Sequence, residues 1–223
     1  MASGNGTTPP ATPSERRVFL LSPARCDGER ARMLLSPRAG FPLAVALRSG
    51  AGAPLGDVMS LLSGLYFRGK LAYARAFASP PRGARDGVLV ITQDSGLRSP
   101  DARVTRDDLL AAAGVDIRSD NRRYREPLEA SVRALARRIG RDCQVVLLGS
   151  VASGKYTDVL VAAFGARLTF PVDFVGRGDM SRGGLMLRCV AAGRQLDYVP
   201  VAGARLHGPR PPRLVPLSRP QGM

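Results

Sequence analysis

Short runs of consecutive apolar residues recur along the chain and predict the strands of a buried sheet. The clearest runs are at residues 17–22, 88–91 and 144–148, and a shorter one follows at 168–171. Continuous apolar runs rich in β-branched residues are typical of strands covered on both faces. Weaker patterns predict one more strand at 44–47 and a last strand at 195–200.

The segments between these runs carry apolar residues at helical spacing. We expect helices at 29–35, at 57–78 with breaks near Gly64 and Gly69, and at 109–113, 126–139, 155–164 and 181–192. Asp57, Thr105 and Ser181 are placed to cap three of these helices. Because strands alternate with helices, the sequence predicts an α/β fold with a central, mostly parallel sheet flanked by helices on both faces.

The two ends of the chain differ in composition from its middle. Residues 1–15 are rich in Gly, Thr, Pro and Ser, which predicts a disordered N-terminal tail. Residues 16–203 suit a single α/β domain, and residues 204–223 form a Pro/Arg-rich C-terminal tail that contains His207, the only histidine.

The chain is strongly basic, with a formal net charge of +15 and only 18 acidic residues. This balance favours a polyanionic partner, nucleic acid first and an anionic membrane surface second. The positive charge is almost all arginine, since Lys70 and Lys155 are the only lysines. The coding bias of a GC-rich genome is an alternative origin for the arginine content, although it does not explain the shortage of acidic residues.

The chain has three widely spaced cysteines, Cys26, Cys143 and Cys189. Their spacing predicts reduced intracellular thiols rather than a zinc site. No apolar run is long enough to span a membrane, and the N-terminus lacks an apolar signal core. We therefore expect a cytoplasmic protein with no metal and no cofactor.

Polar residues follow the predicted strands directly, where open α/β sheets bind ligands. Gln93, Asp94 and Ser95 follow the strand at 88–91, and the alternative for them is a hydrogen-bonded turn. Further strand-end loops lie at 22–26 and 149–154, and a loop at 174–184 combines glycines with Arg177 and Arg182. Backbone N–H groups at the start of a following helix would suit a phosphate.

Two specific chemistries find less support. Residues 149–155 resemble a phosphate-binding loop, but Tyr156 stands where a Ser or Thr should bind magnesium, so a Gly-rich turn is the better interpretation. Ser22 and Cys26 have no histidine near them in sequence to activate a nucleophile, which argues against covalent hydrolase chemistry.

The order of motifs resembles a known family. Residues 63–77, Ser-Gly-Leu-Tyr-Phe-Arg-Gly-Lys-Leu-Ala-Tyr-Ala-Arg-Ala-Phe, precede a strand and the loop Gln-Asp-Ser-Gly-Leu-Arg-Ser-Pro-Asp at 93–101. This order is similar to that of bacterial domains related to the YaaA-type peroxide-stress proteins, over about residues 17–200. The superfamily looks related to the glycosylase-like domain of archaeosine synthase and, distantly, to uracil-DNA glycosylases. Ile91-Thr-Gln-Asp94, Val146-Leu-Leu-Gly-Ser150 and Arg177-Gly-Asp-Met-Ser-Arg182 lie in the order of the glycosylase motifs.

The resemblance implies a nucleic-acid-binding protein with a glycosylase-like base pocket that recognises or cleaves an N-glycosidic bond in DNA or RNA. Asp94 would stabilise the oxocarbenium-like state and Gln93 would bind the base edge, with Tyr66, Tyr73 or Tyr124 stacking on a flipped base. The other expected ligand contacts are Ser22, Cys26, Ser95, Asn121, Ser150, Asp179 and Ser181, with Arg122, Arg123, Lys155, Arg177 and Arg182 for phosphates. The alternatives are a non-enzymatic YaaA-like DNA-binding stress protein and a nucleoside or nucleotide hydrolase.

Overall fold

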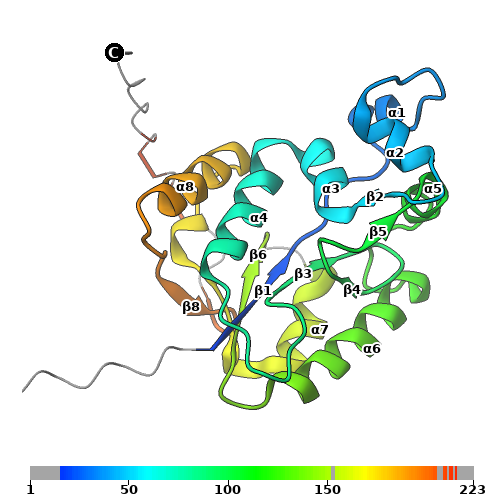
Figure 1. The fold of residues 1–223 in the computed structure, drawn as a ribbon. Coiled ribbons are helices and arrows are strands. Elements are labelled where there is room, and N and C mark those ends of the chain that lie inside the picture. The colour runs from blue at the N-terminus through cyan, green and yellow to red at the C-terminus, as the bar shows by residue number, and fades with distance from the viewer. Residues whose placement is uncertain (1–15, 152–153, 205–207, 210, 213, 215–223) are drawn as a thin grey trace, which may run out of the picture.

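A computed structural model describes residues 16–151, 154–204, 208–209, 211–212 and 214. Figure 1 shows a six-stranded sheet in the order β4-β3-β1-β6-β7-β8, with helices on both of its faces. The four central strands β3, β1, β6 and β7 run parallel, and the edge strands β4 and β8 are antiparallel to their neighbours. The predicted α/β class with a mostly parallel sheet is confirmed.

The strands of this sheet are short. They are β1 (Arg17–Leu21), β3 (Val88–Ile91), β4 (Leu97–Arg98), β6 (Gln144–Leu148), β7 (Leu168–Pro171) and β8 (Tyr198–Pro200). A separate antiparallel pair joins β2 (Ala53–Pro54) to β5 (Arg103–Val104).

The helices of the described residues fill the connections. They are α1 (Glu29–Leu35), α2 (Pro42–Arg48), α3 (Leu55–Ser63), α4 (Leu65–Phe77), α5 (Arg106–Ala113), α6 (Arg122–Ile139), α7 (Gly154–Phe164) and α8 (Asp179–Ala191). Two short 3₁₀ turns, Gly165–Arg167 and Val172–Phe174, flank β7.

Strand β1 divides the core into two layers because successive side chains of a strand point to opposite faces. Phe19 and Leu21 pack with α3, α4 and α8, whereas Val18 and Leu20 pack with α6 and α7. All four side chains are fully buried, which is why this stretch reads as a continuous apolar run.

Several local predictions are wrong. Residues 44–47 belong to helix α2 rather than to a strand, since Pro42 occupies its first turn and only Ala44 and Leu47, three residues apart, are buried. Helix α3 begins before Asp57, which therefore does not cap it. Helix α8 begins at Asp179, before Ser181, and α6 begins at Arg122, four residues earlier than expected.

The two glycines expected to break the long helix behave differently. Gly64 has a φ of +61° and separates α3 from α4, as predicted. Gly69 lies inside α4, where it lets α8 approach closely, because a Cβ atom on Gly69 would lie 2.6 Å from the Gly183 carbonyl oxygen. The cap at Thr105 is confirmed as a reciprocal capping box with Asp108 at the start of α5.

Candidate functional site: a crevice between β1 and β6

The order of the parallel strands places a crevice at the carboxyl ends of β1 and β6. From β1 the chain reaches its next parallel neighbour, β3, on one side, whereas β6 leads to β7 on the other. Connections that diverge in this way leave a gap where open α/β sheets bind ligands. Ser22 follows β1 directly, and Gly149 and Ser150 follow β6.

A cavity of about 390 Å³ lies at this point. It is bordered by the loop after β1, the facing ends of α3 and α4, and the starts of α7 and α8. The lining residues are Ser22, Pro23, Ala24, Arg25, Leu62, Ser63, Tyr66, Ile117, Ser150, Lys155, Tyr156 and Asp179. This size is within the range of small-ligand sites.

Beneath the crevice, the side chain of Lys70 reaches from α4 to the end of β1. Its Nζ donates to the Ser22 carbonyl oxygen at 2.6 Å and to the Ser22 Oγ at 2.9 Å. Lys70 is only 1% exposed, and its ammonium group lies 4.5 Å from the centre of the Tyr66 ring and 4.8 Å from that of Phe67. A lysine is thus held against the one serine at the end of the first strand.

Burial lowers the pKa of Lys70 from 10.5 to about 7. Asp179 and Arg182 of α8 act on this pKa in opposite directions, upward and downward, and their effects are smaller than that of burial. Near neutral pH a substantial fraction of Lys70 is therefore a neutral amine, with a lone pair available to accept a proton.

Tyr156 approaches Ser22 from the other side, at the start of α7. Its hydroxyl donates to the Ser150 carbonyl oxygen at 2.8 Å, and burial raises its pKa to about 12. A hydrogen bond with the Ser22 side chain has a smaller effect on this pKa and lowers it. A Cβ atom on Gly149 would lie 2.9 Å from both the Ser22 Oγ and the Tyr156 hydroxyl oxygen, so only glycine leaves these two groups side by side.

The crevice also contains an unsatisfied polar atom. The Tyr66 hydroxyl is buried and makes no hydrogen bond of normal geometry in the described part of the chain, although the Arg182 side chain lies close enough to lower its pKa. Burial raises the pKa of this phenol, which keeps it protonated at neutral pH. A buried O–H group without a well-formed hydrogen bond is costly.

Both signs of charge border the crevice. Lys155 lies in the first turn of α7, where the helix dipole adds positive potential. Arg25 pairs with Asp27 at 2.9 Å. Asp179, at the start of α8, is 3.5 Å from Arg182. Lys155 thus contributes a positive charge to the lining of the crevice, next to Tyr156.

The crevice brings together five of the residues predicted from sequence. Ser22, Tyr66, Ser150, Lys155 and Asp179 all line it, although they come from four distant segments. This agrees with the expectation that strand-end loops of one sheet converge.

Gln93, Asp94 and Ser95 lie elsewhere, around a cavity of about 30 Å³ between β3, α3 and α5. The Gln93 Nε2 donates to the Ala24 carbonyl oxygen at 2.7 Å and to the Cys26 Sγ at 3.2 Å, so this amide supports the loop after β1. The Thr92 N–H donates to the Gly96 carbonyl oxygen, and the Ser95 Oγ donates to Asp94. Residues 92–96 thus form the hydrogen-bonded turn that was the alternative interpretation.

Other predicted contacts are buried or remote. Cys26 is 3% exposed, and burial raises its pKa to about 12. Tyr124 lies on the buried face of α6 and is 1% exposed. Its ring is therefore closed to a flipped base. Tyr73 is also fully buried. Asn121 caps α6, where Arg122 pairs with Glu126 and Arg123 is exposed.

The arginines near α8 have structural partners. Arg182 donates from two nitrogens to the Phe174 carbonyl oxygen. Arg177 donates to the Ser181 Oγ and the Pro212 carbonyl oxygen. A second groove, of about 520 Å³, is bordered by Arg177, Asp179 and Ser181 together with Pro211, Pro212 and Leu214.

Sequence reasoning missed Lys70 and Tyr156 as site residues. One signal was available, because the chain has 33 lysine and arginine residues and only Lys70 and Lys155 are lysines. Lys155 lines the crevice, and Lys70 lies beneath it against Ser22. Arginine cannot replace lysine where a compact amine must lose its proton, which gives the pattern a chemical reason.

Comparisons with protein-family models, curated proteins and solved structures gave no match to this chain.

Two further searches cover the described residues alone. No three His, Cys, Asp or Glu side chains among them gather in a way that would hold a metal ion. None of the helices in this part of the chain combines the length and apolar character needed to cross a bilayer.

Proposed function

We propose that this chain is a nucleic-acid-binding protein whose crevice between β1 and β6 receives a single nucleotide. The observation that carries the proposal is the position of Lys155, which borders the same cavity as the hydroxyl groups of Ser22, Tyr66 and Tyr156 at the strand-order switch of the sheet. Such a combination of a cation, hydroxyl groups and a helix start suits a phosphate.

The lining of the crevice supports a nucleotide rather than phosphate alone. Pro23, Leu62 and Ile117 are apolar, and the ring of Tyr66 adds an aromatic surface. A base can lie against such surfaces while the hydroxyl groups and Lys155 contact the sugar and phosphate.

The charge of the whole chain supports a polymer as the source of this nucleotide. The net charge of +15 favours polyanions, and exposed arginines such as Arg123 and Arg137 on α6 are available for backbone phosphates. A nucleotide at the end of a nucleic-acid strand, or one rotated out of a duplex, can enter a crevice of this size.

Cleavage of an N-glycosidic bond stays a separate prediction, as does the resemblance to YaaA-type proteins. The expected carboxylate, Asp94, borders the small neighbouring cavity and not the crevice. The sequence also has no Pro-Tyr-His after Asp94, unlike the uracil-DNA glycosylase motif. The proposal therefore covers binding of the nucleotide and assigns no role to Asp94.

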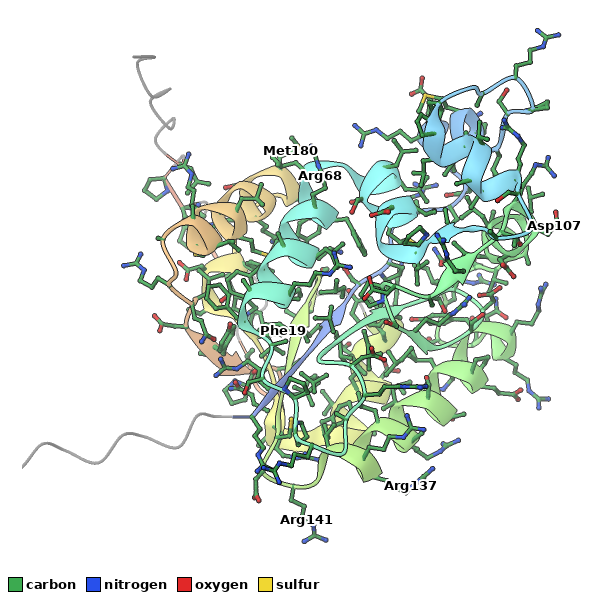
Figure 2. All side chains as sticks on the ribbon, viewed as in Figure 1. Phe19, Arg68, Asp107, Arg137, Arg141 and Met180 are labelled. Carbon is green, nitrogen blue, oxygen red and sulfur yellow. The ribbon has the colours of Figure 1, made fainter. Side chains whose placement is uncertain are left out.

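The test is a titration of a fluorescent single-stranded oligonucleotide, followed by anisotropy at several salt concentrations. We expect affinity to fall steeply with salt, and Lys155→Met to weaken binding about tenfold, equivalent to about 1.4 kcal/mol. Arg141→Met is the matched control, since it also removes one positive charge but precedes β6. Figure 2 shows Arg141 at the end of the sheet opposite Met180, the second residue of α8.

We expect Arg141→Met to change the affinity by less than about twofold, because its charge contributes only to the general attraction. Salt-insensitive binding, or no binding to single-stranded or duplex DNA or RNA, would refute the proposal. Equal losses in the two variants would show that charge matters but that the crevice does not.

A further inference from the structure

Ser22 and Lys70 are placed to perform covalent chemistry that binding alone does not require. We propose that they form a nucleophile–base pair which hydrolyses carboxylic esters through an acyl-Ser22 intermediate. The evidence for the pair is the geometry of its contacts. The identity of the leaving group rests on the proposed function: if it is a nucleotide, the substrate is an acylated nucleotide.

The geometry meets the requirements of an activated serine. The Lys70 Nζ lies 2.9 Å from the Ser22 Oγ, which is within hydrogen-bond reach of a proton transfer. The serine lines the crevice and is 7% exposed, whereas the lysine lies behind it at 1% exposure, so a substrate would meet the hydroxyl and not the amine. Within the described residues no ion pair joins Lys70 to an acidic side chain, and burial outweighs the upward effect of Asp179 on the pKa of Lys70.

The second hydrogen bond of Lys70 fixes its direction. The Nζ donates to the Ser22 carbonyl oxygen at 2.6 Å, and this anchors the amine against the same residue whose hydroxyl it would deprotonate. A neutral amine can keep this N–H bond and accept the Ser22 O–H with its lone pair. The rings of Tyr66 and Phe67 enclose the remaining side of the amine.

The reaction needs no group beyond substrate and water. The Ser22 hydroxyl gives its proton to neutral Lys70 as its Oγ forms a bond to the ester carbonyl carbon. The carbon–oxygen bond to the leaving group then breaks, and the Lys70 ammonium returns the proton to the departing oxygen. Water attacks the acyl-serine, Lys70 takes a proton from it and passes that proton to the Ser22 Oγ, and the carboxylic acid leaves.

Other groups are placed to stabilise the negative charge that develops on the carbonyl oxygen. Tyr156 and Lys155 both lie in the first turn of α7 and line the crevice beside Ser22. The Tyr156 O–H already donates to the Ser150 carbonyl oxygen, so the Lys155 ammonium and the positive end of the α7 dipole are the groups that favour an oxyanion. Tyr156 stays protonated at neutral pH because burial raises its pKa to about 12.

The role of Lys70 has a structural competitor, in which the amine only fastens α4 to the end of β1. In that role Lys70 only donates hydrogen bonds to Ser22, as it can in either protonation state, and Ser22 need not react. The two accounts differ in the reactivity of Ser22 and in its dependence on pH.

The experiment treats the full chain with a fluorophosphonate probe, which forms a serine phosphonate with loss of fluoride, and reads labelling by intact mass and peptide mapping. We expect one adduct, on Ser22, and none in Ser22→Ala. The control Ser95→Ala removes an exposed hydroxyl at the turn after β3, outside the crevice, and should leave labelling unchanged.

The labelling rate of the unaltered protein should rise with pH around a midpoint near 7, as Lys70 loses its proton. The groups facing Lys70 that could alter this midpoint are Asp179 and Arg182 of α8, together with Ser22. Lys70→Met should reduce the rate at least a hundredfold. Because this variant could misfold, the pH profile of the unaltered protein provides the independent measurement.

Hydrolysis of p-nitrophenyl acetate should follow the same pattern and show a burst of nitrophenol. Absence of an adduct at Ser22, or labelling that does not vary between pH 6 and 8, would overturn the proposal. Ser22→Ala separates the two proposals, since it should abolish labelling while changing oligonucleotide affinity less than Lys155→Met does, whereas Lys155→Met should lower both. Labelling without oligonucleotide binding would refute the nucleotide leaving group alone.

Discussion

Gly69 of α4 and Gly183 of α8 face each other with no room for a side chain on either. A Cβ atom on Gly69 would lie 2.6 Å from the Gly183 carbonyl oxygen, and one on Gly183 would lie 2.6 Å from the Leu65 carbonyl oxygen. Because α4 carries Tyr66 and Lys70 while α8 begins at Asp179, this close crossing sets the wall of the crevice.

Gly183→Ala should destabilise the fold, although glycine-to-alanine changes inside helices usually stabilise by up to about 1 kcal/mol. The new methyl group would meet backbone atoms, so we expect a loss of about 1–3 kcal/mol in the free energy of unfolding by urea. The control is Gly184→Ala in the same helix, whose Cβ would only contact Leu214 at 3.5 Å. Equal effects of the two substitutions would contradict the close crossing.

Lys70 should make the stability depend on pH between about 7 and 10.5. In this window the unfolded chain binds a proton at Lys70 that the folded chain releases, so the stability contributed by this group rises with pH and is lowest below pH 7. The urea midpoint should therefore rise more between pH 6.5 and 9.5 for the unaltered protein than for Lys70→Met. Parallel curves for the two proteins would mean that Lys70 stays charged when folded.

Asp94→Asn distinguishes the crevice from the other candidate strand end. Asp94 borders the small cavity at the turn after β3, where its carboxylate accepts from Ser95. We expect the affinity for an oligonucleotide to stay within about twofold of the unaltered protein. A loss as large as that of Lys155→Met would place the ligand at Gln93 and Asp94 instead.

A capping box stabilises the start of α5. The Thr105 Oγ1 accepts from the Asp108 N–H, and the Asp108 carboxylate accepts from the Thr105 N–H, which lowers the pKa of Asp108. Thr105→Ala should cost about 1 kcal/mol, or about 2–4 °C in Tm for a domain of this size. Calorimetry measures this shift, and an unchanged Tm would show that the cap contributes nothing.

The strands were predictable because both faces of the central sheet are covered. β1, β3 and β6 are nearly all apolar, and their runs match the observed elements to within a residue. Strands β2 and β5 have two residues each, too few for an alternation of apolar and polar residues to be seen, so the sequence did not predict them. The strand prediction at residues 44–47 was wrong because Ala-Val-Ala-Leu suits a helix as well as a strand. The burial of Ala44 and Leu47 against the rest of the fold selects the helix.

The site was predictable in part, through the rule that strand-end loops gather ligands. That rule identified Ser22 and Ser150, but it also favoured Gln93 and Asp94, whose side chains support the loop after β1 and close a turn. Lys70 could not be found in this way, because it lies inside a helix and reaches Ser22 across 48 positions of sequence. Its burial as an amine depends on the packing of α4 against the sheet, which no local pattern shows.

Crosslinking of a photoreactive oligonucleotide tests the central claim, that one nucleotide occupies the crevice. A single-stranded oligonucleotide with 5-iodouracil, which reacts with nearby aromatic side chains, would be irradiated with the full chain and the linked peptide identified by mass spectrometry. We predict crosslinks at Tyr66 or Tyr156, suppressed by Lys155→Met and retained in Arg141→Met. Crosslinks confined to the segments around Gln93 and Asp94 or to the arginines of α6, with none at the crevice, would contradict the account.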